Sequence, residues 1–405
     1  MDGSVQLEMR FGAANYAPMP VTLARGKGIY LWDENGRRYI DMMGAYSAAS
    51  FGHCHPRLVQ ALTDQARQLD TVSRAYFSDR LGAFLGRACA LTGMDQALPM
   101  NSGAEAVETA LKAARKWAYK VKEVPADRAE IIVCDGNFHG RTIAIVGFSS
   151  VPQYRDGFGP FPAGFRSVPF GDAAALRAAI TPNTAAFLIE PIQGEGGINV
   201  PPPGYLAEVA RICREQNVLL ICDEIQSGLG RTGKLLACQH DDVKPDAVTL
   251  GKALGGGLLP VSLFLARRDV MQVFKPGDHG STFGGNPIAA AVGLAALNTL
   301  IEENLIERSA RLGAHLLARL RAIRNPIIRE VRGRGLFAGV ELERDLASAA
   351  TVARRLLQAG VLTKDTHRNT VRFAPPLVIE ESEIDWAVDR VAEVLDEFAR
   401  ADVHP

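Results

Sequence analysis

The middle of the chain alternates short runs of apolar, β-favouring residues with longer segments of helical periodicity. The clearest short runs span residues 130–134, 185–190, 218–222 and 247–250. Between them, residues 104–120 and 205–215 place apolar side chains three and four positions apart, which is typical of helices that cover a sheet. This alternation predicts an α/β fold in which a mostly parallel sheet lies between two layers of helices. We expect residues 51–303 to form this large domain.

The pattern changes after residue 303. An Arg- and Leu-rich helix is expected there, followed by a β-rich run near 327–340, a helix near 350–360 and a final helix over 381–399. These segments predict a smaller α+β domain over residues 304–405. In the first fifty residues, the sequence from Trp32 to Gly36 lies between apolar runs and predicts a hairpin turn. We expect residues 1–50 to pack with the C-terminal domain.

Composition excludes several classes of partner. The 45 Lys and Arg residues balance the 45 Asp and Glu residues, and no long run of one sign offers nucleic acid or anionic lipid a footprint. The first ten residues include Asp2 and Glu8 but no apolar stretch, so no secretory signal is expected. The longest nearly apolar run, residues 288–297, is about half of what a membrane-spanning helix needs.

The cysteines argue against a disulfide framework. Six cysteines occur without a Cys-x-x-Cys pair, which favours the reduced thiols of a cytoplasmic protein. His53-Cys54-His55 is the one metal-like cluster. Adjacent residues rarely point to one centre, so we interpret it as a tight turn before Pro56 and expect no metal.

Two residues that follow neighbouring predicted strands carry the most informative chemistry. Asp223 ends the run 218–222, and Lys252 comes just after the run 247–250. The carboxyl ends of parallel strands are where ligands bind in such sheets. A carboxylate that keeps a pyridine nitrogen protonated and an amine that forms an imine are what pyridoxal phosphate (PLP) requires from a protein. The alternative is an exposed acid and a solvated lysine.

Two loops are candidates to bind a phosphate. Ser102 and Gly103 precede a long predicted helix, where a capping hydroxyl and free N–H groups favour anions. The loop of residues 279–287 offers Thr282 as a further contact. Each loop could equally be an ordinary cap or turn.

A glycine-rich loop offers a rival phosphate site. Residues 228–233 match Gly-x-Gly-x-x-Gly, which would place a dinucleotide there and make the chain an NAD-dependent oxidoreductase. The glycines stand five residues beyond the strand, and residues 234–242 do not form a convincing long helix. We therefore favour the PLP interpretation.

Six motifs in chain order resemble those of the class III aminotransferases, a family of fold-type I PLP enzymes. They begin at Asn101 (Asn-Ser-Gly-Ala-Glu-Ala), Asn137 (Asn-Phe-His-Gly-Arg-Thr), Glu190 (Glu-Pro-Ile-Gln-Gly-Glu), Asp223 (Asp-Glu-Ile-Gln), Gly251 (Gly-Lys) and Gly280 (Gly-Ser-Thr-Phe-Gly-Gly-Asn-Pro). Within the family, further segments are most similar to the ornithine aminotransferase branch. They begin at Asn15, Gly44, Gly52, Ser73 and Val371.

The resemblance implies a role for each matching position. Lys252 would be the Schiff-base lysine and Asp223 the partner of the pyridine nitrogen. Gln226 would donate to the ring 3-oxygen, and Phe138 would stack on the ring. The residues implied to bind the phosphate are Ser102, Gly103, Ala104 and Thr282, the last reaching across from the partner subunit of a homodimer. One position departs from the branch, because His139 stands where ornithine aminotransferases can carry tryptophan.

The substrate follows from the charges that the resemblance places in the pocket. 2-Oxoglutarate has two carboxylates, and Arg141 and Arg372 occupy the family's positions for them. Ornithine has one carboxylate, so the arginine near the cofactor must be neutralised, and Glu195 is the family's candidate. Tyr16 and Tyr46 would line the far end and hold the amino-acid head.

The resemblance thus implies transfer of the terminal amino group of L-ornithine to 2-oxoglutarate, giving glutamate 5-semialdehyde and glutamate. An acetylornithine or 4-aminobutyrate aminotransferase is the nearest alternative, and a noncatalytic family member is another. Tyr46 favours ornithine, because an N-acylated substrate has no free head amine for it to meet.

Overall fold

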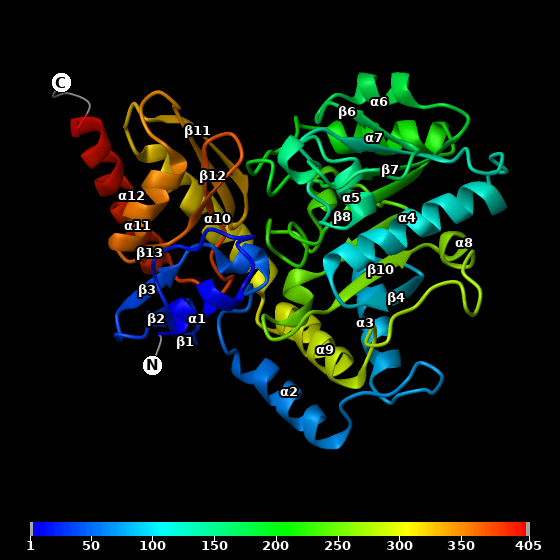
Figure 1. Cartoon of the computed structure of the whole chain (residues 1–405), viewed down its shortest axis with the longest axis horizontal. Coiled ribbons are helices and arrows are strands. Elements are labelled where there is room, and N and C mark those ends of the chain that lie inside the picture. Colours follow the sequence, from blue (N-terminus) through cyan, green and yellow to red (C-terminus); the bar gives the residue numbers. More distant parts are fainter. Residues whose placement is uncertain (1–2, 402–405) are drawn as a thin grey trace.

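The structure is a computed structural model that describes residues 3–401. It has two lobes (Figure 1). One is built around a seven-stranded sheet, and the other combines the N-terminal strands with the elements that follow residue 303. The outermost residues of the two predicted terminal segments, 1–2 and 402–405, lie outside the described residues.

The large sheet confirms the predicted α/β architecture. The strand order is β4 (Gln96–Met100), β10 (Ser262–Ala266), β9 (Ala247–Leu250), β8 (Leu219–Asp223), β7 (Thr184–Ile189), β5 (Glu130–Cys134) and β6 (Phe165–Val168). The four neighbouring pairs along this order from β9 to β6 are parallel, and β10 alone runs antiparallel to both of its neighbours. The four predicted strands are observed as β5, β7, β8 and β9, with ends shifted by no more than one residue.

Successive residues of the central strands pack into different layers of the core. In β5, Ile131 and Val133 belong to the cluster around α4, whereas Ile132 and Cys134 belong to the cluster on the opposite face. Both faces are therefore buried, as a period-two strand between two helical layers requires. The first face is covered by α4 (Gly103–Lys120), α5 (Ile143–Gly147) and α8 (Arg268–Met271), and the second mainly by α3 (Leu81–Thr92), α6 (Ala173–Ala179), α7 (Tyr205–Glu215) and α9 (Pro287–Glu302), with α2 (Pro56–Gln68) on α9.

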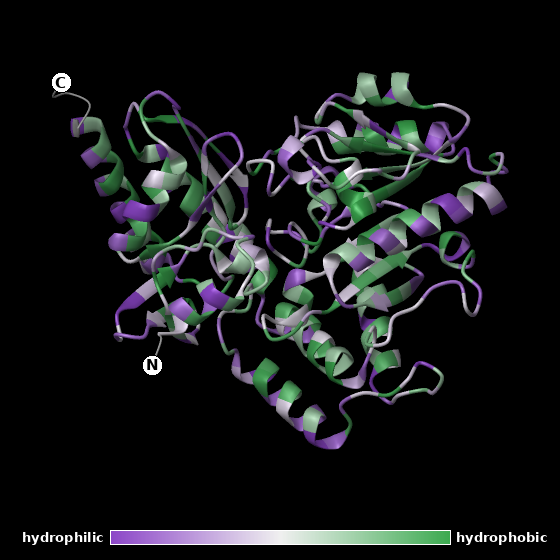
Figure 2. Ribbon diagram, in the orientation of Figure 1, coloured by the Kyte–Doolittle hydropathy of each residue, from purple (hydrophilic) through white to green (hydrophobic). Residues whose placement is uncertain are grey.

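Hydropathy follows this layering. The strands of the large sheet are mostly green in Figure 2, and the purple residues of α4 and of the last helix, α12 (Glu381–Ala401), gather on one side of each helix. The apolar sides of these helices are buried in the core clusters.

The smaller lobe holds two four-stranded sheets. The first has the order β1 (Leu23–Lys27), β2 (Tyr30–Asp33), β3 (Arg38–Asp41) and β13 (Val361–Leu362). The predicted hairpin is β2–β3, where Trp32 pairs with Arg38. β3 pairs in parallel with β13, so strands from the two ends of the chain share a sheet. The exact domain limits, at residues 50 and 303, stay a prediction.

The second small sheet corrects one expectation. The run predicted near 327–340 is two strands, β11 (Ile328–Arg334) and β12 (Phe337–Leu342), because the chain turns at Gly335 with a φ of +56°. The sheet order is β11, β12, β15 (Thr370–Phe373) and β14 (Lys364–Thr366). The helices of this lobe are α10 (Leu305–Ala322), α11 (Ala349–Gln358) and α12 (Glu381–Ala401), and α1 (Ser4–Phe11) lies near the N-terminus.

Within residues 3–401, no single helix is long and apolar enough to cross a membrane. Only α9 and α10 taken together pass on length and composition, and they are bent by 61° at the break between them. All six cysteines are free thiols, as predicted.

Candidate functional site

Asp223 and Lys252 lie at the carboxyl ends of two adjacent parallel strands. Asp223 is the last residue of β8, and Lys252 opens a short 3-10 helix, Lys252–Gly255, after β9. Lys252 has a φ of +43°, an unusual conformation that points to a constrained turn. Both residues line a pocket of about 190 Å³ together with Gly103, Ala104, Phe138, His139, Glu190 and Gln226. The structure thus brings most of the predicted cofactor residues to one cavity.

Asp223 is held by three donors. Its Oδ1 accepts hydrogen bonds from Thr249 Oγ1 at 3.0 Å and from the Ile225 N–H at 3.1 Å. Its Oδ2 lies 2.7 Å from Nδ1 of His139, which is buried. Burial alone would lower the pKa of His139, but the bond to Asp223 outweighs it and the pKa is raised. The pair therefore favours an imidazolium beside a carboxylate.

Lys252 presents its amine to the same pocket. Among residues 3–401, no hydrogen bond or ion pair is formed with its Nζ atom. Burial lowers the pKa of this amine, although the charges of Glu195 and Asp223 oppose the effect. An unbonded amine with a lowered pKa is better suited to nucleophilic attack and to proton transfer than a solvated lysine.

The start of α4 provides an anion-binding terminus. Ser102 is the N-cap, and its Oγ accepts from the N–H of Glu105 at 3.2 Å while the Glu105 carboxylate accepts from the Ser102 N–H at 2.6 Å. The N–H groups of Gly103 and Ala104 are too early in the helix to have an intrahelical partner. A Cβ on Gly103 would lie 3.0 Å from Ile225, so the absence of a side chain lets the helix end approach the pocket closely.

Glu190 joins two loops of the site, a role that was not predicted. Its carboxylate accepts from the Phe138 N–H at 2.9 Å and from the Gly194 N–H at 3.2 Å. Burial raises its pKa to about 7. Its place in the motif that ends at Glu195 was visible in the sequence, but nothing local indicated which backbone it would bind.

A buried ion pair stands at the edge of the pocket. Arg372 of β15 donates from Nη1 to Glu195 Oε1 at 2.6 Å and from Nη2 to Oε2 at 2.8 Å, a bidentate geometry. The side chain of Arg372 is only 1% exposed. The arginine overcomes the effect of burial and holds the pKa of Glu195 at about 2, so the pair is ionised over the working pH range. Gln226 Nε2 also lies 3.4 Å from Glu195 Oε1.

Arg141 packs on Phe138 and Tyr154, two aromatic residues that line a second, wider hollow. This hollow of about 500 Å³ shares Phe138 with the first pocket and is also lined by Glu195, Tyr154 and His367. The guanidinium carbon of Arg141 is 3.7 Å from the ring centroid of Tyr154 and 5.3 Å from that of Phe138. No ion pair to Arg141 is formed in the part of the chain that the structure describes. It is thus an exposed cation available to a carboxylate.

The two tyrosines differ in their surroundings. Tyr46 is half-buried, and its ring lies against Arg372, with the guanidinium carbon 4.9 Å from the ring centroid. It thus contacts the arginine that Glu195 neutralises, and its place at the far end of the substrate pocket stays a prediction. Tyr16 is 73% exposed and lies near enough to Tyr46 to affect its titration.

Of the predicted cofactor residues, Ser102 does not line the pocket, and neither does Thr282. Its loop lies beside the start of α4, because Asn101 Nδ2 donates to Ser281 Oγ at 2.8 Å. Thr282 itself is exposed and does not line the cavity.

The two rival motifs have structural explanations. In the glycine-rich loop, Arg231 is fully buried and donates to the carbonyls of Leu336 and Pro375. A Cβ on Gly233 would lie 2.8 Å from Ala310, so this loop packs against the other lobe and opens no long helix. The imidazoles of His53 and His55 pair with different carboxylates, those of Asp41 and Glu303. Residues 3–401 contain no group of three or more side chains arranged to hold a metal ion.

Comparison with known proteins agrees with this site. The sequence model of the aminotransferase class-III family matches residues 11–395. The chain belongs to the class-III aminotransferases. It is 56% identical over 390 residues to a protein named ornithine aminotransferase from Geobacillus sp. (strain WCH70), covering 96% of this chain and 97% of that protein.

Two solved structures are similar over nearly the whole chain. The ornithine aminotransferase from Toxoplasma gondii is 46% identical, with a TM-score of 0.96, covering 98% of this chain and 94% of that one. The acetylornithine aminotransferase from Elizabethkingia anophelis is also 46% identical, with a TM-score of 0.89, covering 97% and 98%. The class-III family is PLP-dependent, and the chain is a transaminase.

The residues present fit this cofactor. The pocket holds an unbonded lysine amine, a carboxylate at its floor, an aromatic ring and a helix N-terminus with free N–H groups. These are the groups that the aldehyde, the pyridine nitrogen, the ring face and the phosphate each need.

Proposed function

We propose that this class-III aminotransferase transfers the terminal amino group of L-ornithine to 2-oxoglutarate, giving glutamate 5-semialdehyde and glutamate. The observation that carries the proposal is the pairing of Glu195 with Arg372 at the pocket while Arg141 has no ion pair within the described residues. One cationic site is thus neutralised and the other is open. This asymmetry suits a substrate with a single carboxylate remote from its reacting amine.

The same pocket accepts 2-oxoglutarate when the pair opens. Both substrates carry a carboxylate remote from the reacting carbon, and Arg141 binds it in each case. 2-Oxoglutarate carries a second carboxylate next to its reacting carbon, which displaces Glu195 from Arg372. Tyr16 and Tyr46 help hold the head of ornithine. Glu195 therefore acts as a gate that is closed for ornithine and open for the diacid.

The cofactor is held by groups from both helical and strand elements. PLP, when bound, supplies an electron sink that stabilises negative charge on the reacting carbon. Asp223 would stabilise the protonated pyridine nitrogen, and His139 holds that carboxylate through its Nδ1 atom. Phe138 would cover the ring face, and Gln226 would donate to the ring oxygen. Ser102, Gly103 and Ala104 would bind the phosphate.

Lys252 moves the proton. Its Nζ atom would hold the cofactor through an imine and, when free, would accept a proton from the substrate carbon and donate it again. Burial lowers the pKa of this amine, which favours its basic form relative to a solvated lysine.

Thr282 of the partner subunit completes the phosphate site in a homodimer. Support comes from the exposed position of Thr282 in its own chain, beside the start of α4 but outside the pocket. Sedimentation analysis of the holoenzyme is expected to give a dimer mass. The neutral charge balance and the free thiols support a cytoplasmic enzyme without a nucleic-acid or membrane partner.

N-Acetylornithine is the second candidate substrate, because an acetylornithine aminotransferase is also 46% identical. The test is a panel of ornithine, N-acetylornithine and 4-aminobutyrate with 2-oxoglutarate, with kcat/KM measured for each. Ornithine is expected to be highest, with the semialdehyde as its product. A higher kcat/KM for N-acetylornithine would reassign the substrate.

A further inference from the structure

The gate residue Glu195 lies on a tight turn of the large lobe. Side chains from three strands of the smaller lobe form hydrogen bonds with this turn. This gate turn consists of residues 194–197. Arg372 of β15 binds the Glu195 side chain, and Thr366 Oγ1 of β14 donates to the Glu195 carbonyl at 2.6 Å. Arg332 of β11 binds the carbonyl of Gly197. The gate is therefore built across the two lobes.

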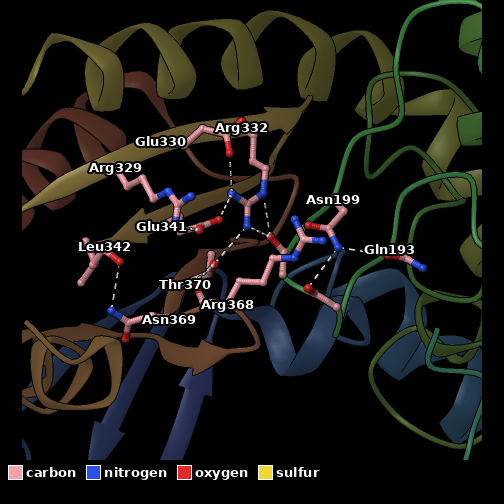
Figure 3. Close-up of polar contacts among 12 residues, drawn as sticks. Gln193, Asn199, Arg329, Glu330, Arg332, Glu341, Leu342, Arg368, Asn369 and Thr370 are labelled. Atoms are coloured by element: carbon pink, nitrogen blue, oxygen red, sulfur yellow. Dashed lines mark hydrogen bonds and ion pairs between the residues drawn. The ribbon is translucent and has the colours of Figure 1, made fainter. Parts of the chain in front are cut away.

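Arg332 makes the most complete of these contacts. Its Nε and Nη2 atoms both donate to the Gly197 carbonyl, at 3.0 and 2.6 Å. Nη2 also donates to Thr370 Oγ1 at 3.1 Å, and Nη1 donates to Glu341 and Glu330 (Figure 3). A guanidinium has five N–H donors, so every donor of this buried side chain is used. The two acids balance its charge, and its fork fixes the direction in which it meets the turn.

The backbone of the gate turn has little room to move. The Gly194 N–H donates to Glu190, and the Gly197 and Ile198 N–H groups donate back to the Gly194 carbonyl. A Cβ on Gly197 would lie 3.0 Å from the His367 carbonyl and 3.1 Å from Arg332 Nη2. With the main chain held on both sides, opening the gate is left to rotation of the Glu195 side chain.

We propose that Arg332 is a positioning residue that determines which amino group of ornithine reacts. It holds the gate turn in the position from which the Glu195 side chain can pair again with Arg372 after each cycle. This inference rests on the proposed function of Glu195 as the gate. When the contact between Arg332 and the Gly197 carbonyl is weakened, Glu195 pairs less often with Arg372, which can then bind a substrate carboxylate. Ornithine can then bind in reverse, with its carboxylate on Arg372 and its α-amino group at the reacting position, and yield the 2-oxo acid instead of the semialdehyde.

The test replaces Arg332 by lysine in the holoenzyme. Lysine keeps the charge beside Glu341 but cannot reproduce the two-donor contact with the Gly197 carbonyl. The matched control is Arg329→Lys, because Arg329 lies on the same strand and pairs with the same Glu341 at 3.5 Å but is 61% exposed and does not contact the turn. Two readouts are taken: the ratio of 2-oxo acid to semialdehyde from ornithine, and the calorimetric Kd of the unreactive diacid glutarate.

Arg332→Lys is expected to raise the 2-oxo acid fraction and to tighten glutarate binding, each by roughly tenfold and by at most about 100-fold, the scale of a 1 Å misplacement. Arg329→Lys should stay within about twofold of the parent, as expected for an exposed pair. In a Glu195→Gln background, Arg332→Lys should add no further change to either readout, because both residues act through one gate.

Two results would overturn the inference: an unchanged product ratio and glutarate Kd in Arg332→Lys, or an effect of equal size with and without Glu195. Equal slowing of both half-reactions with a lowered melting temperature would mean that Arg332 only stabilises the fold. If the parent enzyme forms no semialdehyde from ornithine, the proposed function fails first. The glutarate measurement still decides whether Arg332 controls access to Arg372.

Discussion

Removing the charge of Glu195 should convert a selective enzyme into one that binds ornithine in two orientations. Glu195→Gln keeps the volume of the side chain but leaves Arg372 without its carboxylate partner. Arg372 is 1% exposed, and its two bonds to Glu195 are 2.6 and 2.8 Å long. Breaking a buried pair by removing one partner typically costs about 3–5 kcal/mol, because the remaining charge stays buried.

Part of that cost returns as binding energy when a substrate carboxylate reaches Arg372. If about 2 kcal/mol returns, the affinity of Arg372 for a carboxylate rises about 30-fold. Ornithine gains this only in the reversed orientation, which places its α-amino group at Lys252. The 2-oxo acid should therefore increase about 30-fold relative to the semialdehyde. The glutamate half-reaction should be slowed far less, because the α-carboxylate of glutamate occupies Arg372 in both enzymes.

Single-turnover mixtures of the PLP enzyme with ornithine provide the assay. The two products are separated and quantified, and the glutamate half-reaction is followed in parallel. Semialdehyde as the sole product, with both half-reactions slowed alike, would refute the gate. Selectivity would then have to come from Tyr16 and Tyr46.

Four further outcomes are expected. Lys252→Ala should abolish turnover, and borohydride reduction should no longer attach PLP covalently to the protein, which stays folded. Retained turnover with a normal circular dichroism spectrum would show that Lys252 takes no part in the mechanism. Asp223→Ala should slow both half-reactions by roughly 100-fold or more, since both develop charge on the same cofactor, and a loss confined to one amino substrate would make Asp223 a substrate residue. Tyr16→Phe should raise KM for ornithine by roughly tenfold, the effect of losing about one hydrogen bond, and should change KM for 2-oxoglutarate little. Tyr16 is 73% exposed and thus open to a substrate. Equal effects on both substrates would contradict a contact between Tyr16 and the head of ornithine. The pKa of Glu190 is raised from its usual 4.5 to about 7 in the folded protein. Between these two values the folded state keeps a proton that the unfolded state loses. The contribution of Glu190 to the free energy of unfolding is therefore fully present below pH 4.5 and is lost as the pH rises through 7. Urea unfolding at pH 5 and pH 8 should show a decline of up to about 3 kcal/mol from this group that Glu190→Gln lacks, and identical pH slopes in the two proteins would contradict the raised pKa.

The buried strands of the large sheet could be predicted because their signal is local. β5 and β9 fill both faces with apolar residues, and such runs between amphipathic helices leave few other folds. The edge strands were harder to find. β4 contains Pro99, which argues against a central strand, and β6 exposes half of its residues. An edge strand pairs with a neighbour on one side and leaves its other side open. Its residues are therefore less constrained to be apolar, and the sequence pattern that marks a strand is weaker.

The site divides in the same way. The N-cap at Ser102 and the positions of Asp223 and Lys252 follow from strand and helix ends, which a sequence marks directly. The gate needs partners 177 residues apart, Glu195 and Arg372, and nothing in either neighbourhood indicates the other beyond the family resemblance. The bond from Arg332 to Gly197 spans 135 residues and had no sequence signal at all.

The composition of the gate turn nevertheless constrains what surrounds it. Three glycines in four residues cost conformational entropy on folding, so a turn of this kind indicates close approach by neighbouring groups. The structure identifies these neighbours: a Cβ on Gly194 would lie 1.6 Å from Gln226 Oε1, and one on Gly196 would lie 2.7 Å from the Gly136 carbonyl. The first contact comes from the cofactor pocket, and Arg332 meets Gly197 from the other lobe. The glycines of the sequence indicate that the turn is crowded. Only the tertiary fold determines that one of the neighbouring groups is Arg332, whose five N–H donors allow it to hold the turn in place.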